Sequence, residues 1–480
     1  MKKIEILPLF LIILIGLILR LQNINRPIAD WHSWRQADTA AVARNFIKEG
    51  YNPFIPKYDD MSSQSNGIDN PNRYRFVEFP IYNSLIAVVW SFTSYYNIAA
   101  ARLVTVFISL GSVALLYFIV RFYSSWQTAA LSSFFFTFIP YNIFYSTVIL
   151  PAPLMVFFIL AAYLTFIKWL EKENSWGYLL LSSIFTSCAI LTWPIALFFT
   201  LPLVYLVFNK FGLASLKQFK LWIFLALALL PFIAWRIWIT NFPEGIPNWR
   251  FLLNENNIRF KGAFFRWLIV ERLGRLILSV SGFTLLVIGI IKKPNVKEKY
   301  FYYSWLLGGL LYVSVFASGN IRHDYYQIPL IPILSIYLAL GTKFILDLPS
   351  QYISKVISRL IIILLVLFTF AFGYFEIRGF YWINKPQIVE AGKAVDRLLP
   401  PNATVIAPYN GDAAFLYQTN RNGYPIVDRP LEEYIDQGTK YLVSVDTADS
   451  GIQNLATHCK VIEKKDNYVI IEMFKDCIGK

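Results

Sequence analysis

The chain has 480 residues, of which 56% are hydrophobic and 15% are charged, and its formal net charge is +14. Soluble globular proteins carry about 25% charged residues, so the composition excludes an ordinary soluble domain and indicates a polytopic membrane protein. The positive charge does not indicate a nucleic-acid partner, because much of the lysine and arginine lies in short segments between apolar runs, where membrane topology explains it.

Apolar runs recur along the chain at close to the roughly 20 residues with which a helix crosses a bilayer. Alternate connections are basic, as at Arg121, Lys168 and Lys210, and such connections face the cytoplasm. The pattern predicts an α-helical, multi-pass protein of the cytoplasmic membrane with a cytoplasmic N-terminus and about eleven transmembrane helices. The predicted spans lie near residues 5–22, 99–121, 127–147, 150–168, 176–192, 194–209, 220–240, 272–291, 299–318, 328–346 and 357–378.

Between the first two spans lies a long outer loop, residues 23–98, which we predict to be interfacial and part of a membrane domain of residues 1–378. Within it, residues 37–48 have the pattern of a short amphipathic helix on the membrane surface. Residues 80–97 are apolar, but counting them as a span would place every later basic loop outside. We therefore expect that segment to be interfacial or re-entrant.

The last part of the chain, residues 379–480, is more highly charged and predicts a small extracytoplasmic α/β domain. Its strand-like runs are residues 403–407, 440–445 and 468–474, with a helix over 431–437. Two cysteines, Cys459 and Cys477, lie here. They form a disulfide if the domain is in an oxidising compartment, and they are free thiols otherwise; the sequence leaves both alternatives open.

A first polar cluster follows the first span and contains Asp30, His32, Arg35, Gln36 and Asp38. Ionisable side chains at a membrane boundary are costly to leave unpaired, so they indicate a site. A carboxylate near an arginine stays ionised and can act as a general base or a metal ligand. The alternative is a capped interfacial helix in which Asp38 balances the helix dipole.

A second cluster, Arg73, Arg75 and Glu78, ends the outer loop just before an apolar segment. Glu78 is costly there unless it is paired, and the two arginines are candidate partners or anion contacts. The alternative is a helix entrance that the arginines merely anchor at the membrane surface.

The third cluster consists of five consecutive residues between two spans: Arg322, His323, Asp324, Tyr325 and Tyr326. A cation, an imidazole and two phenols can bind a phosphate. The alternative is an aromatic belt with a helix cap. The sequence contains no glycine-rich phosphate loop, zinc-ligand spacing or serine nucleophile elbow, so we expect neither ATP-driven chemistry nor a metal site of known spacing.

These clusters carry a resemblance to the membrane glycosyltransferases of the GT-C fold. The chain resembles their bacterial branch, which is related to protein mannosyltransferases and to lipid A aminoarabinose transferases. This branch is similar to glycosyltransferase family 39. The resemblance lies in residues 34–39 (WRQADT) with 43–46 (ARNF), 78–82 (EFPIY), 145–146 (YS) with 151–155 (PAPLM), and 322–326 (RHDYY) with Pro329.

The resemblance implies transfer of a hexosyl or pentosyl group from a polyprenyl-phosphate donor to a hydroxyl of a lipid, glycan or protein at the extracytoplasmic face, with inversion. It implies that Asp38 is the catalytic base, with Asp30 as the alternative, and that Glu78 positions a substrate. The spacing around Asp38 differs by a few residues from the Asp-Glu pattern of the family. The residues implied to bind the donor are Arg35, His32, Gln36, Arg73, Arg75, Arg322, His323, Asp324, Tyr325 and Tyr326.

Relatives carry an acidic residue in the second outer turn, where this chain has Ala152, and this weakens the case for a divalent metal. Three other functions remain open: a transporter or flippase of lipid-linked glycans, a glycan polymerase or ligase, and a non-enzymatic partner protein. A transporter places ionisable residues near mid-membrane and often shows repeated halves. Here the clusters lie at the ends of spans and no repeat is evident, which favours a transferase.

Overall fold

The computed structural model describes residues 3–172, 175–293, 295, 297 and 300–478, so the first residue of the predicted span 299–318 lies outside the described residues. The chain forms two compact units. Unit 1 comprises Met1–Ile24, Arg102–Arg236 and Trp249–Gly379, and unit 2 comprises Asn25–Ala101, Ile237–Asn248 and Phe380–Lys480. The first outer loop therefore belongs to the same unit as the C-terminal residues.

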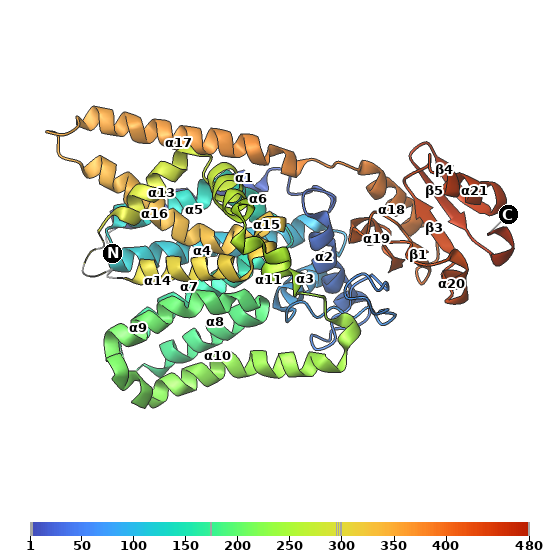
Figure 1. Cartoon of the computed structure of the whole chain (residues 1–480), viewed down its shortest axis with the longest axis horizontal. Helices are drawn as coiled ribbons and strands as arrows, with labels where there is room; N and C mark the ends of the chain where they lie inside the picture. Colours follow the sequence, from blue (N-terminus) through green and yellow to red (C-terminus); the bar gives the residue numbers. More distant parts are fainter. Residues whose placement is uncertain (1–2, 173–174, 294, 296, 298–299, 479–480) are drawn as a thin grey trace. The chain divides into compact units, whose positions relative to one another are not determined.

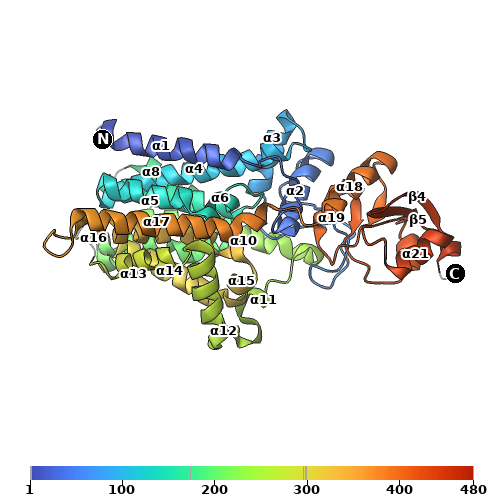
Figure 2. The same ribbon diagram turned by 90° about the horizontal axis from the view of Figure 1, so that it is seen from above.

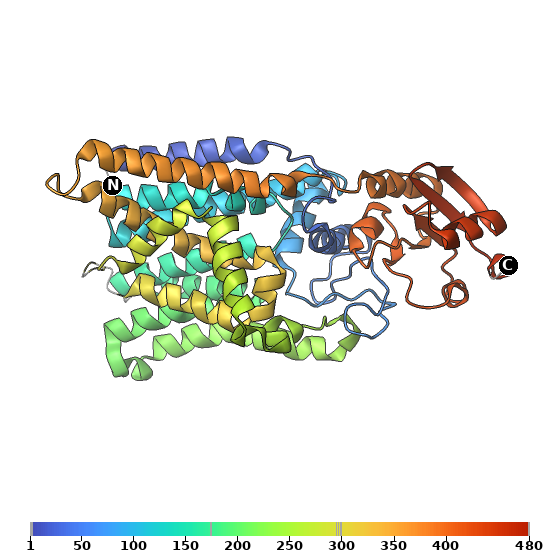
Figure 3. The same cartoon turned by 45° about the horizontal axis from the view of Figure 1, so that its top comes forward.

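Unit 1 is built of helices, and its long helices run side by side along one direction (Figures 1 and 2). Helix α17 extends along the surface of the unit, where Figure 3 shows it in orange, and most of it is exposed. The principal helices are α1 (Lys3–Leu21), α4 (Ile98–Tyr123), α5 (Trp126–Phe138), α6 (Pro140–Tyr145), α7 (Ala152–Glu171), α8 (Trp176–Thr192), α9 (Leu201–Phe211), α10 (Phe219–Trp238), α11 (Phe251–Asn254), α12 (Gly262–Phe265), α13 (Ser281–Ile291), α14 (Phe301–Val315), α15 (Ala317–Arg322), α16 (Ile331–Asp347) and α17 (Lys355–Ile377).

Every predicted span coincides with one helix or with two consecutive helical segments. Among the described residues, six helices are long and apolar enough to cross a membrane, or seven if Gly262–Ile277 and Ser281–Ile291, which meet at 113°, form one broken span. Helices α8 and α14 have 17 and 15 residues, fewer than the roughly 20 that cross a bilayer. The chain is thus an integral membrane protein, as predicted, while the number of eleven spans stays a prediction.

Small residues allow the close packing of α13 against α16 in unit 1. A Cβ atom on Gly289 would lie 1.9 Å from the carbonyl oxygen of Tyr337, and one on Gly341 would lie 2.0 Å from that of Leu285. No larger residue fits at either position without moving a backbone. Membrane helices use small residues at such contacts because lipid provides no hydrophobic drive for association.

Unit 2 contains a five-stranded sheet with the strand order β2-β1-β3-β5-β4. Strand β1 pairs in parallel with β2 and β3, and β5 pairs antiparallel with β3 and β4. The elements of the unit are α2 (Ser33–Lys48), α3 (Ile81–Phe92), α18 (Pro386–Leu398), β1 (Thr404–Ile406), α19 (Ala413–Gln418), β2 (Asn422–Tyr424), α20 (Leu431–Asp436), β3 (Tyr441–Ser444), α21 (Ser450–His458), β4 (Lys460–Lys465) and β5 (Tyr468–Glu472).

The α/β character predicted for the C-terminal residues is confirmed, because β1, β3, β5 and α20 lie where strands and a helix were expected. The core of the sheet buries Ile406, Leu442 and Ile471, together with both cysteines. Cys459 and Cys477 form a disulfide across this core, which decides between the two alternatives left open by the sequence.

Helix α2 corrects one expectation from the sequence. Residues 35–46 are all buried, so α2 is not an amphipathic helix with one exposed polar face. Its alanines, among them Ala37 and Ala40, bring neighbouring backbones close, and its charged side chains find partners inside the unit. Helix α3, with 12 residues, is too short to cross a bilayer alone.

Candidate active site

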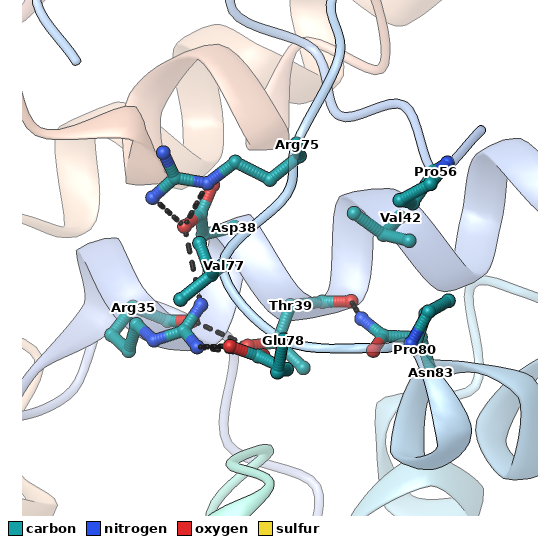
Figure 4. A pocket seen from close by; sticks show the side chains of 10 residues that line it. All are labelled: Arg35, Asp38, Thr39, Val42, Pro56, Arg75, Val77, Glu78, Pro80 and Asn83. Atoms are coloured by element: carbon teal, nitrogen blue, oxygen red, sulfur yellow. Dashed lines mark hydrogen bonds and ion pairs between the residues drawn. The ribbon is translucent and has the colours of Figure 1, made fainter. Parts of the chain in front are cut away.

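Helix α2 and the segment before α3 bring four predicted residues together. Arg35 and Asp38 lie one turn apart on α2, and Arg75 and Glu78 approach them from the chain that leads into α3 (Figure 4). The Oδ2 atom of Asp38 accepts hydrogen bonds from Arg75, whose Nε is at 2.9 Å, and from Nη1 of Arg35 at 3.3 Å. Two guanidinium groups therefore hold one oxygen of this carboxylate.

The second carboxylate oxygen of Asp38, Oδ1, has a different environment. Its side chain is 3% exposed, and Oδ1 is buried without a hydrogen-bond partner among the residues that the structure describes. Asp38 lines a cavity of about 10 Å³ that Arg35, Arg75, Glu78 and Asn83 also border, close to the space that one water molecule needs. A buried polar atom without a partner is costly, so Oδ1 can accept a hydrogen bond from a group that enters this cavity.

Glu78 contacts Arg35 with both of its oxygens. They accept hydrogen bonds from Nη2 of Arg35 at 2.7 and 2.8 Å, and both side chains are nearly buried. This ion pair fixes the guanidinium that also contacts Asp38. The geometry makes Glu78 a residue that orients Arg35.

Asp30, the alternative candidate for the base, forms a separate group. Its Oδ1 accepts a hydrogen bond from Nε2 of Gln36 at 2.8 Å, and its Oδ2 accepts one from Arg26. Both oxygens are therefore engaged. His32 precedes α2 with a left-handed backbone (φ 56°), and its ring makes an edge contact with Trp31 at 5.3 Å.

Arg73 holds the outer loop to the sheet. It donates hydrogen bonds to Oε2 of Glu49 at 2.8 Å, to the carbonyl of Tyr58 at 3.2 Å and to Oδ1 of Asn422 at 3.0 Å. Asn422 is the first residue of β2. These contacts give Arg73 a structural task in addition to the anion binding predicted for it.

Two residues of this region were missed by the sequence analysis, Tyr58 and Asp60. The guanidinium of Arg75 lies 4.9 Å from the ring centre of Tyr58, whose hydroxyl donates to Asp60 at 3.4 Å. Asp60 also accepts a hydrogen bond from the amide of Ser62 at 2.7 Å. Burial raises the pKa of Asp60 to about 6. The two adjacent acidic residues Asp59 and Asp60 are the feature of the sequence that could have pointed to this site.

We expect Asp60→Asn to stabilise the protein above pH 6 and to leave its stability unchanged near pH 4. The pKa of Asp60 is higher in the folded chain than its ordinary value of 3.8, so the contribution of the protonated acid is complete below pH 3.8 and is lost as the pH rises through 6. Asparagine does not ionise, and the gain at pH 7.5 is about 3 kcal/mol. Melting temperatures between pH 4 and 7.5 test this.

Asp69→Asn is the matched control for this pH profile. Asp69 is exposed, and its hydrogen bond with Arg429 lowers its pKa. Its stabilising contribution is present above its ordinary pKa, so its removal acts in the opposite direction at pH 7.5. If the melting temperatures of wild type and Asp60→Asn changed in parallel with pH, the raised pKa of Asp60 would be contradicted.

In unit 1 the third cluster divides into an exposed cation and a buried anchor. Arg322 is half exposed, pairs with Glu255 and lies 5.5 Å from the ring centre of Phe251. Asp324 is buried, and the hydroxyls of Tyr145 and Tyr141 donate to its Oδ1 and its backbone carbonyl, each at 2.5 Å. Asp324 thus fixes the turn that carries Arg322.

The aromatic part of this cluster is compact. The ring of His323 lies 5.5 Å from each of the rings of Tyr325 and Tyr326, and Trp193 meets Tyr326 edge to face at 5.2 Å. The structure therefore brings Trp193 against the predicted phosphate-binding residues.

Arg272 is a further residue missed by the sequence analysis, because it opens the predicted span 272–291. It lies in a π-helix, η6 (Arg266–Ile277), a geometry that is frequent at functional sites. One Nη atom is 3.9 Å from the carboxylate of Asp324, and the other donates to the carbonyl of Ile321. Its Nε has no partner among the described residues.

Ala152 is buried at the first position of α7, where a family acid was expected. Within the described parts of the chain, no group of three or more His, Cys, Asp or Glu side chains is placed to hold a metal ion. No step of the chemistry below is assigned to a metal.

Comparison with known proteins identifies the fold. Residues 78–238 match the family model of dolichyl-phosphate-mannose-protein mannosyltransferase. In the comparison with curated proteins, no sequence matches this chain. Among solved structures, the chain is similar to ArnT from Cupriavidus metallidurans bound to undecaprenyl phosphate, with a TM-score of 0.66 and 14% identity over 98% of this chain and 99% of ArnT.

A second similar structure is the oligosaccharyltransferase AglB from the archaeon Archaeoglobus fulgidus, in complex with an inhibitory peptide and a dolichol-phosphate. The TM-score is 0.55 and the identity 11%, over 92% of this chain and 70% of AglB. Together these likenesses show that the chain has the fold of the GT-C glycosyltransferases, which confirms the predicted resemblance. Of the predicted fold class they confirm the mostly helical GT-C architecture with a small C-terminal sheet, while the eleven spans and their topology stay predictions.

Proposed function

We propose that the chain transfers a sugar from a polyprenyl-phosphate donor to a hydroxyl of a lipid, glycan or protein, with inversion. The observation that carries this proposal is the buried Oδ1 of Asp38, which lies beside a cavity and has no hydrogen-bond partner among the described residues, while two arginines hold Oδ2. This is the arrangement that a general base needs, because one oxygen is fixed and the other is available to a proton.

In the proposed reaction, the acceptor hydroxyl gives its proton to Oδ1 of Asp38 as its oxygen attacks the anomeric carbon. The bond between that carbon and the phosphate oxygen breaks, and the electron pair leaves with the polyprenyl phosphate. Attack from the face opposite the leaving group inverts the configuration. Phosphate is already a good leaving group, so no nucleotide is required. The protein lowers the activation barrier by positioning the two substrates and by neutralising the charge on the departing phosphate.

We assign the donor phosphate to Arg322, His323 and Tyr325, joined by Arg272. Arg322 offers an exposed guanidinium, and Arg272 has a buried N–H without a partner among the described residues. Guanidinium groups bind phosphate through paired hydrogen bonds. The similar structures support this class of donor, since ArnT was solved with undecaprenyl phosphate and AglB with a dolichol-phosphate.

Binding of undecaprenyl phosphate to the purified chain tests the donor assignment. We expect undecaprenyl phosphate to raise the melting temperature of the wild-type protein, and undecaprenol, which has the same tail without the phosphate, to have little effect. Arg322→Ala and Arg272→Ala should each weaken the phosphate-dependent shift. Equal shifts with both lipids in all three proteins would show that the protein binds the polyprenyl tail and does not recognise the phosphate.

We further propose that the Asp38 cluster and the Arg322 cluster both lie on the extracytoplasmic side of the cytoplasmic membrane, with the N-terminus inside and the C-terminal domain outside. The disulfide Cys459–Cys477 supports this placement, because disulfides persist in oxidising compartments.

Labelling of introduced cysteines tests that placement. In a Cys188→Ser background, an impermeant thiol reagent should label Tyr51→Cys and Phe260→Cys in intact cells, because both positions are exposed. Tyr51 lies between the first two clusters in the sequence, and Phe260 ends the helical segment η5 (Glu255–Phe260), whose Glu255 pairs with Arg322. Leu213→Cys, in a loop predicted to be cytoplasmic, should react only after permeabilisation. Labelling of Tyr51→Cys and Phe260→Cys from opposite sides would contradict the placement of both clusters outside.

A further inference from the structure

A second cavity lies where four helices of unit 1 end. It has a volume of about 370 Å³, and the residues that line it include Trp169, Trp176, Lys217, Phe219 and Lys220. This volume falls in the range of small-molecule sites. The cavity shares no residue with the Asp38 site, and the proposed transfer reaction makes no use of it.

The wall of this cavity is basic. Residues 209–220 contain three lysines and no acidic residue, and two of these lysines, Lys217 and Lys220, line the cavity. The Nζ atom of Lys220 is 5.5 Å from the ring centre of Trp176. Nearby Glu171 pairs with Lys168 at 2.7 Å, so its charge is balanced. The cavity is therefore suited to an anion.

Two helix N-termini also border the cavity. Trp176 is the first residue of α8, and Phe219 is the first residue of α10. The first N–H groups of a helix lack partners within the helix and carry partial positive charge, which favours anions. At α8 the N-cap residue, Ser175, makes no capping hydrogen bond with its side chain.

An unpartnered buried donor supplies an independent sign of a ligand. Trp169 lines the cavity and is 2% exposed, and its indole N–H has no hydrogen-bond partner in the described part of the chain. Buried polar groups are nearly always hydrogen-bonded, and each exception calls for an explanation. A phosphate oxygen would accept this hydrogen bond once the indole turned its buried N–H toward the cavity.

Exposed apolar side chains lie in the segment that contributes Phe211 and residues 217–220 to the cavity. Leu213, Leu216 and Phe219 are among the most exposed hydrophobic residues of the chain, at 79%, 63% and 71%. A free phosphate would gain nothing from them, whereas a lipid would lay its acyl chains along them. Basic pockets between membrane helices are suited to anionic lipid headgroups.

We propose that this cavity binds the phosphodiester headgroup of an anionic phospholipid. Lys217 and Lys220 neutralise the phosphate, the indole of Trp169 donates to it, and the acyl chains cover Leu213, Leu216 and Phe219. The site is independent of the sugar donor.

Native mass spectrometry of the full-length protein in detergent tests the proposal. The probes are phosphatidylglycerol, phosphatidylcholine with the same acyl chains, and inorganic phosphate as a competitor. We expect wild type to retain phosphatidylglycerol at least fivefold better than phosphatidylcholine, and Lys217→Ala/Lys220→Ala to lose this preference. Trp169→Phe, which keeps the ring and removes the N–H, should retain less phosphatidylglycerol while both lysines remain.

Lys292→Ala/Lys293→Ala is the matched control, because it removes the same charge at the end of α13, outside the cavity. It should bind lipid as wild type does. Retention of phosphatidylglycerol by Lys217→Ala/Lys220→Ala at the wild-type level would overturn the site, and so would equal loss in the control. Displacement of the lipid by millimolar inorganic phosphate would instead assign the cavity to free phosphate and overturn the lipid.

Discussion

Asp38→Asn is expected to lower the rate of sugar transfer from a polyprenyl-phosphate donor by about 10²- to 10⁴-fold, the range that general-base catalysis supplies. The amide oxygen can still accept from Arg35 and Arg75, but it cannot take a proton from the acceptor hydroxyl. Release of polyprenyl phosphate from a radiolabelled donor, measured in proteoliposomes together with membrane acceptors, gives the rate.

Asp59→Asn is the matched control for this variant. Asp59 is also buried in unit 2 and pairs with an arginine, Arg44, so the control reproduces the loss of a buried ion pair but leaves the proposed base in place. Per folded molecule, Asp59→Asn and Asp30→Asn should retain most of the activity. Full activity of Asp38→Asn would reject Asp38 as the base, and selective loss in Asp30→Asn would transfer the role to Asp30.

Arg35→Ala is expected to lower the free energy of unfolding by about 3 to 5 kcal/mol, because it removes one partner of a buried ion pair and leaves the other charge uncompensated. The side chain of Glu78 is 8% exposed, and Arg35 binds both of its oxygens. Denaturant unfolding in detergent, followed by tryptophan fluorescence, measures the loss.

Two further variants distinguish the effect of breaking this ion pair from the effect of removing any arginine. In Arg35→Met/Glu78→Gln the uncompensated charge is gone, so most of the stability should return. Arg397→Ala removes an arginine whose side chain is 63% exposed and pairs with Glu463, and exposed pairs contribute at most about 1 kcal/mol. A loss in Arg35→Ala no larger than that in Arg397→Ala would contradict the buried network.

Hydropathy predicted the helices well because each span is a local property of about 20 consecutive residues. Short strand-like runs predicted β1, β3 and β5 for the same reason. The sequence analysis missed β2, with three residues including Gly423, and β4, which is charged and mostly exposed. The local sequence of neither strand has the run of buried, apolar residues by which the other strands were predicted.

The burial of α2 could not be predicted because it depends on partners far along the chain. Arg75 and Glu78 pair with Asp38 and Arg35 across 37 and 43 residues, and no spacing rule reports such contacts. Local composition showed charged residues and alanines, which is also the pattern of a surface helix. The cluster at residues 322–326 was found, but Arg272 was missed because an apolar run follows it directly.

The most direct test of the account follows a doubly labelled polyprenyl-phosphate sugar in proteoliposomes that contain the purified chain and membrane acceptors. We predict that the label in the sugar moves to the acceptor, while the label in the lipid remains as free polyprenyl phosphate. A donor that passes between leaflets with both labels still joined, and is never cleaved, would show a transporter of lipid-linked sugars and contradict glycosyl transfer.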